Sequence, residues 1–215
     1  MAVVSTLKAT RSGRIAVHLD GEYACTVGDA LLVRLGLYVG LSLTDEQVEE
    51  LRSEASAERA LSDAHRLLGH RARARAELGA RLAARGHSEP VVRRVLAHLQ
   101  ADGLLDDEAF ARAYVADGRR LRGWGTERIA RELGRLGADP AAVQAALSDA
   151  GANAQADELQ RALQALSKQR PGAPAEVARR RAYQLLVRRG FSTTVAYDAV
   201  RQWSASMSAD PEEQT

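Results

Sequence analysis

Residues 77–99 read ELGARLAARGHSEPVVRRVLAHL, and the spacing of their apolar residues indicates the fold. Leu78 and Leu82 stand eight and four residues before Gly86, which places both on one face of a helix. After the glycine, apolar residues return at a spacing of four: Val91, Val95 and Leu99. Glycine readily takes the left-handed conformation that ends a helix. The stretch therefore predicts a helix, a turn at Gly86 and a second helix.

The same pattern occurs twice more along the chain. Gly137 follows Gly86 by 51 residues, and Gly190 follows Gly137 by 53 residues. Each glycine has apolar residues eight and four positions before it, and apolar residues return in the helix that follows. A residue that can cap a helix precedes each second helix: Ser88, Asp139 and Ser192. Self-similarity at a nearly fixed period is the signature of a repeat protein.

A leading helix precedes each helix–turn–helix pair, and we expect these helices at residues 56–69, 106–121 and 153–167. The sequence thus predicts a mainly α protein built from three tandem three-helix repeats. Five segments are expected: an N-terminal β-hairpin with an acidic helical arm (1–55), repeat 1 (56–103), repeat 2 (104–151), repeat 3 (152–203) and a disordered tail (204–215).

The first residues of the chain have the pattern of strands. Apolar and polar residues alternate over residues 14–20 and 22–27, with Asp20-Gly21 between them, which is a strong signal for a hairpin. A lone hairpin is marginal in water, so we expect it to pack on a short helix at residues 28–35. Thr44 and Gln47 then form a capping box that starts a long helix with an acidic first half.

Charge is distributed unevenly along the chain, although the net charge is only +2. Residues 20–58 carry nine acidic and two basic side chains, whereas residues 66–135 carry fifteen basic and nine acidic side chains. A basic middle segment indicates an anionic partner, and a set of solvated helix faces would have the same composition.

Composition argues against several classes of protein. No apolar run approaches the ~20 residues that span a bilayer, and the first ten residues lack the apolar core of a signal peptide. The single cysteine, Cys25, allows neither an internal disulfide nor a cysteine-based zinc site. The five histidines have no ligand spacing, and no nucleophile stands at a readable spacing from a base. We therefore expect a cytoplasmic protein that is not an enzyme and holds no metal or cofactor.

Nine arginines are the candidate contact residues for an anionic partner. Three surround the start of a predicted helix, three precede the Gly123-Trp124-Gly125 turn, and three recur along one stripe of the next helix. They are Arg71, Arg73, Arg75, Arg119, Arg120, Arg122, Arg128, Arg131 and Arg135. The guanidinium group is a planar, two-pronged donor that suits phosphate and carboxylate. Such residues could hold a nucleic-acid backbone or an acidic protein surface.

The centre of the chain carries a long motif. It consists of GLLDDEAFARAYV at 103–115, Arg119, Gly123-Trp124-Gly125, RIAREL at 128–133 and Gly137. The flanks RARARAEL at 71–78 and LLVRRGF at 185–191 accompany it. Together these residues closely resemble the RecX family, bacterial regulators of the RecA recombinase.

The resemblance implies an elongated, curved, solenoid-like molecule that binds in the groove of the RecA–DNA filament. It implies inhibition of RecA, with limits on filament growth, ATPase, strand exchange and co-protease activity, and no catalysis. The expected partners are the RecA filament and the single-stranded DNA within it, with no membrane, and the expected state is a monomer. Two alternatives stay open: a free-standing helix-turn-helix-like nucleic-acid-binding protein, and a helical adaptor with a purely protein partner.

Overall fold

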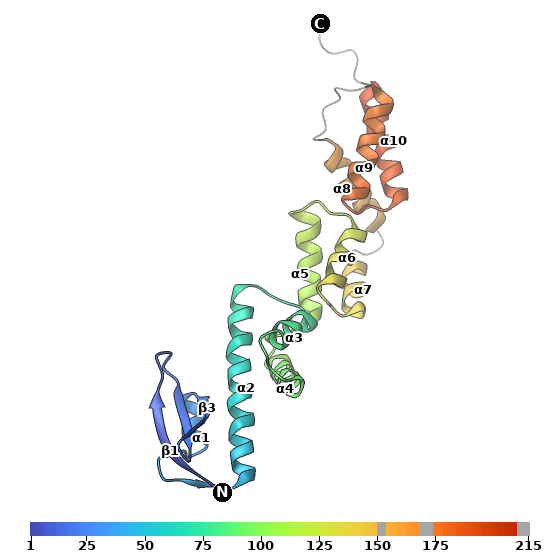
Figure 1. Ribbon diagram of the computed structural model, residues 1–215. Helices are drawn as coiled ribbons and strands as arrows, with labels where there is room; N and C mark the ends of the chain where they lie inside the picture. The colour runs from blue at the N-terminus through green and yellow to red at the C-terminus, as the bar shows by residue number, and fades with distance from the viewer. Residues whose placement is uncertain (150–153, 168–173, 210–215) are drawn as a thin grey trace. The chain divides into compact units, whose positions relative to one another are not determined.

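The computed structural model describes residues 1–149, 154–167 and 174–209 (Figure 1). The chain forms two compact units, Met1–Leu105 and Asp106–Thr215. The first unit contains β1 (Ala2–Ala9), β2 (Ile15–Leu19), β3 (Glu22–Val27), α1 (Asp29–Arg34), β4 (Ser42–Leu43), α2 (Asp45–His70), α3 (Arg75–Ala83) and α4 (Glu89–Ala101). The second contains α5 (Asp107–Arg120), α6 (Thr126–Arg135), α7 (Pro140–Ser148), α8 (Ala154–Ser167), α9 (Ala175–Arg188) and α10 (Thr193–Ala209).

The mainly α architecture of three-helix repeats is confirmed. The second half of α2 shares one apolar core with α3 and α4, and helices α8, α9 and α10 share another. Between them in sequence, α5 packs on α6 and α7, with Phe110, Ile129 and Leu133 buried. Each repeat turns at its glycine, because Gly86, Gly137 and Gly190 have φ values of 84°, 72° and 80°.

The predicted hairpin is present, but it belongs to a larger sheet. Strands β2 and β3 pair antiparallel across Asp20 and Gly21, both at positive φ, and the full strand order is β3-β2-β1-β4. The sequence pattern missed β1 because a bulge at Ser5 breaks its alternation: Val4 pairs with Leu19 but Thr6 pairs with His18. The short helix α1 covers the sheet through Leu31, as expected.

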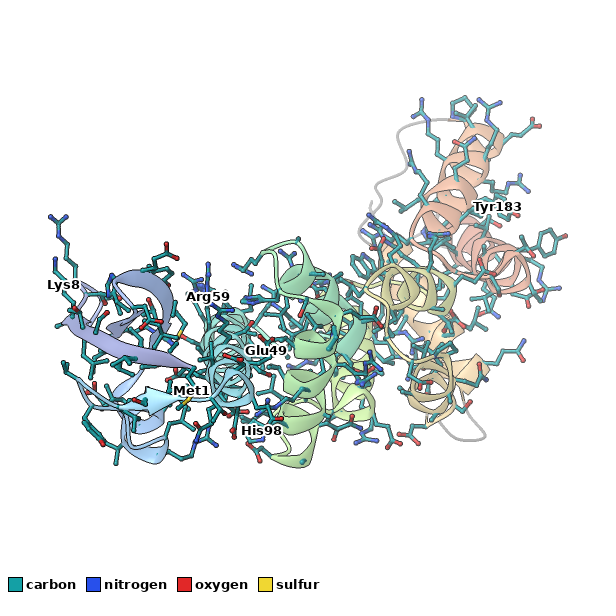
Figure 2. The ribbon with its side chains drawn as sticks, turned by 60° about the horizontal axis from the view of Figure 1, so that its bottom comes forward. Met1, Lys8, Glu49, Arg59, His98 and Tyr183 are labelled. Carbon is teal, nitrogen blue, oxygen red and sulfur yellow. The ribbon has the colours of Figure 1, made fainter. Side chains whose placement is uncertain are left out.

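Helix α2 is one continuous helix that serves two cores. Its first half, through Val48, Leu51 and Ala55, packs on the sheet and α1, and its second half packs on α3 and α4. In both views α2 lies between the sheet and the α3–α4 pair (Figures 1 and 2). The boundary expected between residues 55 and 56 therefore falls inside a helix, since both halves of α2 have an apolar stripe to bury.

Most of the predicted helix starts have the caps that the sequence indicated. Thr44 and Gln47 form the capping box, and the side chains of Asp106 and Asp139 accept hydrogen bonds from Ala109 N and Ala141 N. Ser192 Oγ accepts from Val195 N in the same way. Ser88 is the N-cap residue of α4, as predicted, but its side chain accepts no hydrogen bond from a backbone amide of the helix.

The C-terminal tail also differs from the prediction. Helix α10 continues to Ala209, so residues 204–209 are helical and not disordered. Alanine and methionine in this stretch keep helix propensity high enough to extend a helix that is already nucleated. The rest of the predicted tail, residues 210–215, lies outside the described residues.

Candidate binding surfaces

Two of the first three predicted arginines, Arg71 and Arg73, gather around one largely covered carboxylate on α3. Glu77 Oε1 accepts from Arg71 Nη2 at 2.6 Å, Arg73 Nη1 at 2.5 Å and Arg81 Nε at 2.9 Å. Burial raises the pKa of Glu77, but the hydrogen bonds from Arg81 and Arg71 outweigh this effect and hold the pKa below its usual value. The cluster joins the end of α2 to the start of α3.

Arg73 therefore does not belong to an exposed contact surface. Only 8% of the residue is exposed, and its Nε donates to Leu67 O at 3.1 Å, at the C-terminal end of α2. The spacing of two between Arg71, Arg73 and Arg75 suggested three equivalent side chains. Arg75, however, is the first residue of α3, so only Arg71 and Arg73 lie in the segment between α2 and α3, and of the three arginines Arg73 alone is buried.

One arginine of the second group, Arg122, and one of the third, Arg128, lie against the aromatic ring of Trp124. The guanidinium of Arg122 lies 4.6 Å from the ring centroid of Trp124 and that of Arg128 lies 4.4 Å from it. Arg122 also lies 5.5 Å from the ring of Tyr114. Cation–π contacts of this kind hold the guanidinium planes while leaving N–H edges free to donate. The sequence predicted the arginines but not the ring that orders them.

Arg119 is partly buried in the second unit. Its Nη2 donates to Leu147 O at 3.1 Å, at the end of α7, and its Nε is buried without a hydrogen-bond partner. Burial, and then the charge of Arg119, lower the pKa of Arg161 on α8. Arg119 thus links α5 to α7, and its removal would disturb packing as well as any contact with a partner.

Three predicted arginines on α5 and α6 are exposed. Arg135 pairs with Glu132 at 3.1 Å on its own helix. Arg120 and Arg131 form no ion pair with any part of the chain that the structure describes. These two residues are the members of the predicted set that have a free, solvated guanidinium in the second unit.

The start of α6 docks on the end of α9 through two glycines. Gly125 N donates to Arg189 O at 2.9 Å, and Glu127 N donates to Gly190 O at 3.1 Å. A helix start has unpaired N–H groups and a helix end has unpaired C=O groups, so each end satisfies the other. Thr126 N donates to Glu158 Oε1 of α8 at 2.8 Å, which adds a charged cap. Repeat 2 and repeat 3 are joined backbone to backbone here.

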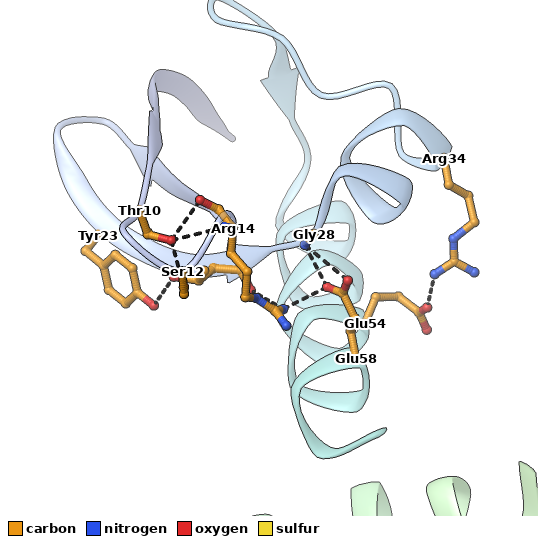
Figure 3. A network of polar contacts seen from close by, with 9 residues as sticks. Thr10, Ser12, Arg14, Tyr23, Gly28, Arg34, Glu54 and Glu58 are labelled. Atoms are coloured by element: carbon orange, nitrogen blue, oxygen red, sulfur yellow. Dashed lines mark hydrogen bonds and ion pairs between the residues drawn. The ribbon is translucent and has the colours of Figure 1, made fainter. Parts of the chain in front are cut away.

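Two glutamates of α2 bind the N-terminal sheet and α1 within the first unit (Figure 3). The Glu58 carboxylate accepts from Gly28 N, at 2.9 Å to Oε2, and from Arg14 Nη2 at 2.9 Å. Glu54, one turn earlier, accepts from Arg34 of α1 and Arg94 of α4. These two carboxylates of α2 connect the sheet, α1 and α4, whereas Glu46, Glu49 and Glu50 nearer the start of the helix are exposed.

The geometry of Glu54 predicts acid sensitivity of the first unit. The hydrogen bond from Arg94 is the largest cause that lowers the pKa of Glu54 below its ordinary value of 4.5. A lowered folded-state pKa contributes stability that is present above pH 4.5 and is lost as the pH falls through the folded-state value. We expect Glu54→Gln to lower stability at neutral pH and to flatten the loss below pH 4.5, as measured by thermal unfolding followed by circular dichroism. Glu49→Gln, an exposed position of the same helix, is the control, and equal slopes for the two variants would contradict the prediction.

Within the ranges described, no group of three or more His, Cys, Asp or Glu side chains is arranged to hold a metal ion. No described helix is both long and apolar enough to cross a bilayer. Cys25 is 8% exposed, and burial raises the pKa of its thiol, as expected of a structural cysteine.

Known proteins show clear similarity to both units. Residues 60–99 match the family model for RecX, first three-helix domain, and residues 106–147 match the model for RecX, second three-helix domain. The regulatory protein RecX of Mycobacterium sp. (strain JLS) is 41% identical over 140 residues, which are 63% of this chain and 76% of that protein. The regulatory protein RecX of Geobacillus thermodenitrificans (strain NG80-2) is 31% identical over 183 residues, 84% of this chain and 68% of that protein.

Solved structures agree in fold. A crystal structure of a regulatory protein RecX superposes with a TM-score of 0.70 at 24% sequence identity, and the match covers 94% of this chain and 100% of that chain. The crystal structure of RecX from Lactobacillus salivarius gives a TM-score of 0.61 at 17% identity, over 70% of this chain and 97% of that chain.

Proposed function

This chain belongs to the RecX family of regulatory proteins, and from that premise we propose that it inhibits the RecA recombinase. It binds in the groove of the RecA–DNA filament and limits filament growth, ATPase, strand exchange and co-protease activity. It acts in the cytoplasm as a monomer, by binding and without catalysis. The single-stranded DNA of the filament is a second partner.

One observation carries the proposal. The motif that resembles the family forms an ordered three-helix repeat in which Arg120 and Arg131 are exposed and Trp124 holds Arg122 and Arg128 in place. Exposed guanidinium groups on a rigid frame suit an extended, negatively charged surface better than a small-molecule substrate. A binding protein of this kind needs a row of donors, and it does not need a catalytic pocket.

RecA ATPase on single-stranded DNA tests the proposal directly. We expect the wild-type protein to inhibit at amounts well below one molecule per RecA, because a block to filament growth stops many protomers at once. Order of addition provides the control, since a growth block acts more strongly when the protein is present before the filament assembles. Inhibition that appears only at equal amounts would indicate capture of free RecA, and no inhibition would contradict the proposal.

A further inference from the structure

We propose that the first unit has a separate binding site, a basic groove that holds the sugar–phosphate backbone of a single-stranded DNA. The groove has a volume of about 950 Å³ and lies between strand β3, one face of α2 and the turn between α3 and α4. None of the nine arginines predicted from the sequence lines it. The inference deepens the proposed function and rests on it only for the choice of DNA as the strand.

The α2 face of the groove carries a row of arginines. Arg52, Arg59 and Arg66 are spaced by seven residues, so they stand almost in line along the helix, about 10.5 Å apart. Arg59 is labelled in Figure 2, on α2 between the sheet and helices α3 and α4. Arg14 lines the groove from the sheet side and Arg85 from the α3–α4 turn. Five guanidinium groups thus face one groove from three parts of the unit.

Little negative charge balances these arginines. Asp63 is the acidic residue of the groove lining, and it accepts from Arg66 and, at 2.8 Å, from His87. Arg14 is held by Glu58. Arg52, Arg59 and Arg85 are exposed and have no ion-pair partner among the residues that the structure describes. The groove therefore presents three uncompensated cations at separate points along its length.

The chemistry of the groove favours a single-stranded nucleic acid. A row of guanidinium groups matches a polymer that carries one phosphate in every monomer. Tyr23 of β3 lies in the lining, is 62% exposed and offers a ring on which a base can stack. Its hydroxyl lies 3.0 Å from Thr26 Oγ1, and its ring packs edge-on against His18, so the ring is already ordered. The apolar lining consists of small residues, Ala24, Cys25 and Ala55, which give an acidic peptide no deep pocket for an anchor.

Binding of a labelled oligothymidine to the full chain, without RecA, tests the inference by fluorescence anisotropy. We expect Arg59→Glu with Arg85→Glu to weaken binding at least tenfold and to lower the slope of log K against log salt by about 1.4, or about 0.7 for each lost phosphate contact. The matched control is Arg11→Glu with Arg93→Glu, which changes net charge equally at exposed positions of the same unit. Equal weakening in both double variants would overturn the proposal, because the effect would then be one of total charge.

Two further variants test the stacking contact. Tyr23→Ala should weaken binding about tenfold, whereas Tyr23→Phe keeps the ring and should bind as the wild type does. Circular dichroism confirms that each variant is folded. Displacement of the strand by poly-glutamate at equal charge, or preference for a duplex over the single strand, would show that the groove has a different ligand and would overturn the proposal.

The same variants separate this inference from the proposed function. If the wild type inhibits RecA while the groove variant binds the strand normally, the groove proposal fails and the function stands. If the wild type binds the strand through the groove and never inhibits RecA, the function fails and the groove proposal stands.

Discussion

Gly190→Ala is expected to destabilise the second unit by about 3 kcal/mol or more. Gly190 has φ of +80°, where an alanine costs ~1–2 kcal/mol. An added Cβ would also stand 2.2 Å from the Cβ of Arg128 and 2.4 Å from its backbone N. Relief of that clash must separate α6 from α9, which removes the two backbone hydrogen bonds that join the repeats.

Substitutions at two other glycines separate the cost of backbone strain from the cost of the clash between the repeats. Gly86 occupies the same turn in repeat 1 with φ of +84°, but an added Cβ there would meet nothing within 4 Å. Gly86→Ala should therefore cost only the backbone strain. Gly125 has an ordinary φ of −78°, and its added Cβ would stand 2.2 Å from Gly190 O. Gly125→Ala should therefore cost only the contact between the repeats.

Native-state hydrogen exchange measures these differences locally. The amides of Gly125 and Glu127 report the junction, because their acceptors are Arg189 O and Gly190 O. Both variants at the junction should speed exchange there, and the double variant should cost less than the sum, because each substitution breaks the same contact. A Gly190→Ala variant no less stable than Gly86→Ala would contradict the role assigned to the junction.

At Gly190 the sequence pattern predicts the turn but not the contact with α6. The repeat spacing predicted its turn, because the positive φ depends on residues within one helix–turn–helix pair. The close approach of α6 depends on residues more than sixty positions earlier, and no local pattern contains that information. The sequence motif includes Gly125, but its contact with Gly190 could not be predicted for the same reason, since nothing in its own segment requires a glycine at φ of −78°.

The sequence shows where the arginines lie along the chain, but it does not show which of their side chains are exposed. A spacing of two placed Arg73 with Arg71 and Arg75, yet Arg73 is covered because Glu77 and Leu67 O both draw its guanidinium inward. The net charge of a segment also concealed exposed arginines within it. Residues 20–58 are acidic in total, but Glu54 and Glu58 are paired with arginines. Arg52, in the same range, lines the groove together with Arg59 and Arg66 of α2. The seven-residue spacing of Arg52, Arg59 and Arg66 was the signal that could have shown this row.

Arg120→Glu with Arg131→Glu is expected to raise the concentration of this protein that half-inhibits RecA ATPase by at least tenfold. Both side chains are exposed, and neither has an ion-pair partner among the described residues, so reversal leaves no buried charge behind. Arg119 and Arg122 are left unchanged, because Arg119 donates to Leu147 O and Arg122 lies on the ring of Trp124. Circular dichroism and thermal unfolding then confirm that the helices of the variant are intact.

Arg180→Glu with Arg181→Glu is the matched control, since it alters net charge equally at exposed positions of α9, outside the predicted set. This comparison separates direct contact by Arg120 and Arg131 from a general electrostatic attraction between the two partners. If Arg120 and Arg131 touch the filament, their reversal places carboxylates against an acidic surface and repels it, whereas the control pair changes only the distant field, which salt screens over about 10 Å. Equal loss of inhibition in both variants would mean that overall charge attracts the filament, and that the RecX-like motif of repeat 2 does not supply the contact through these two residues.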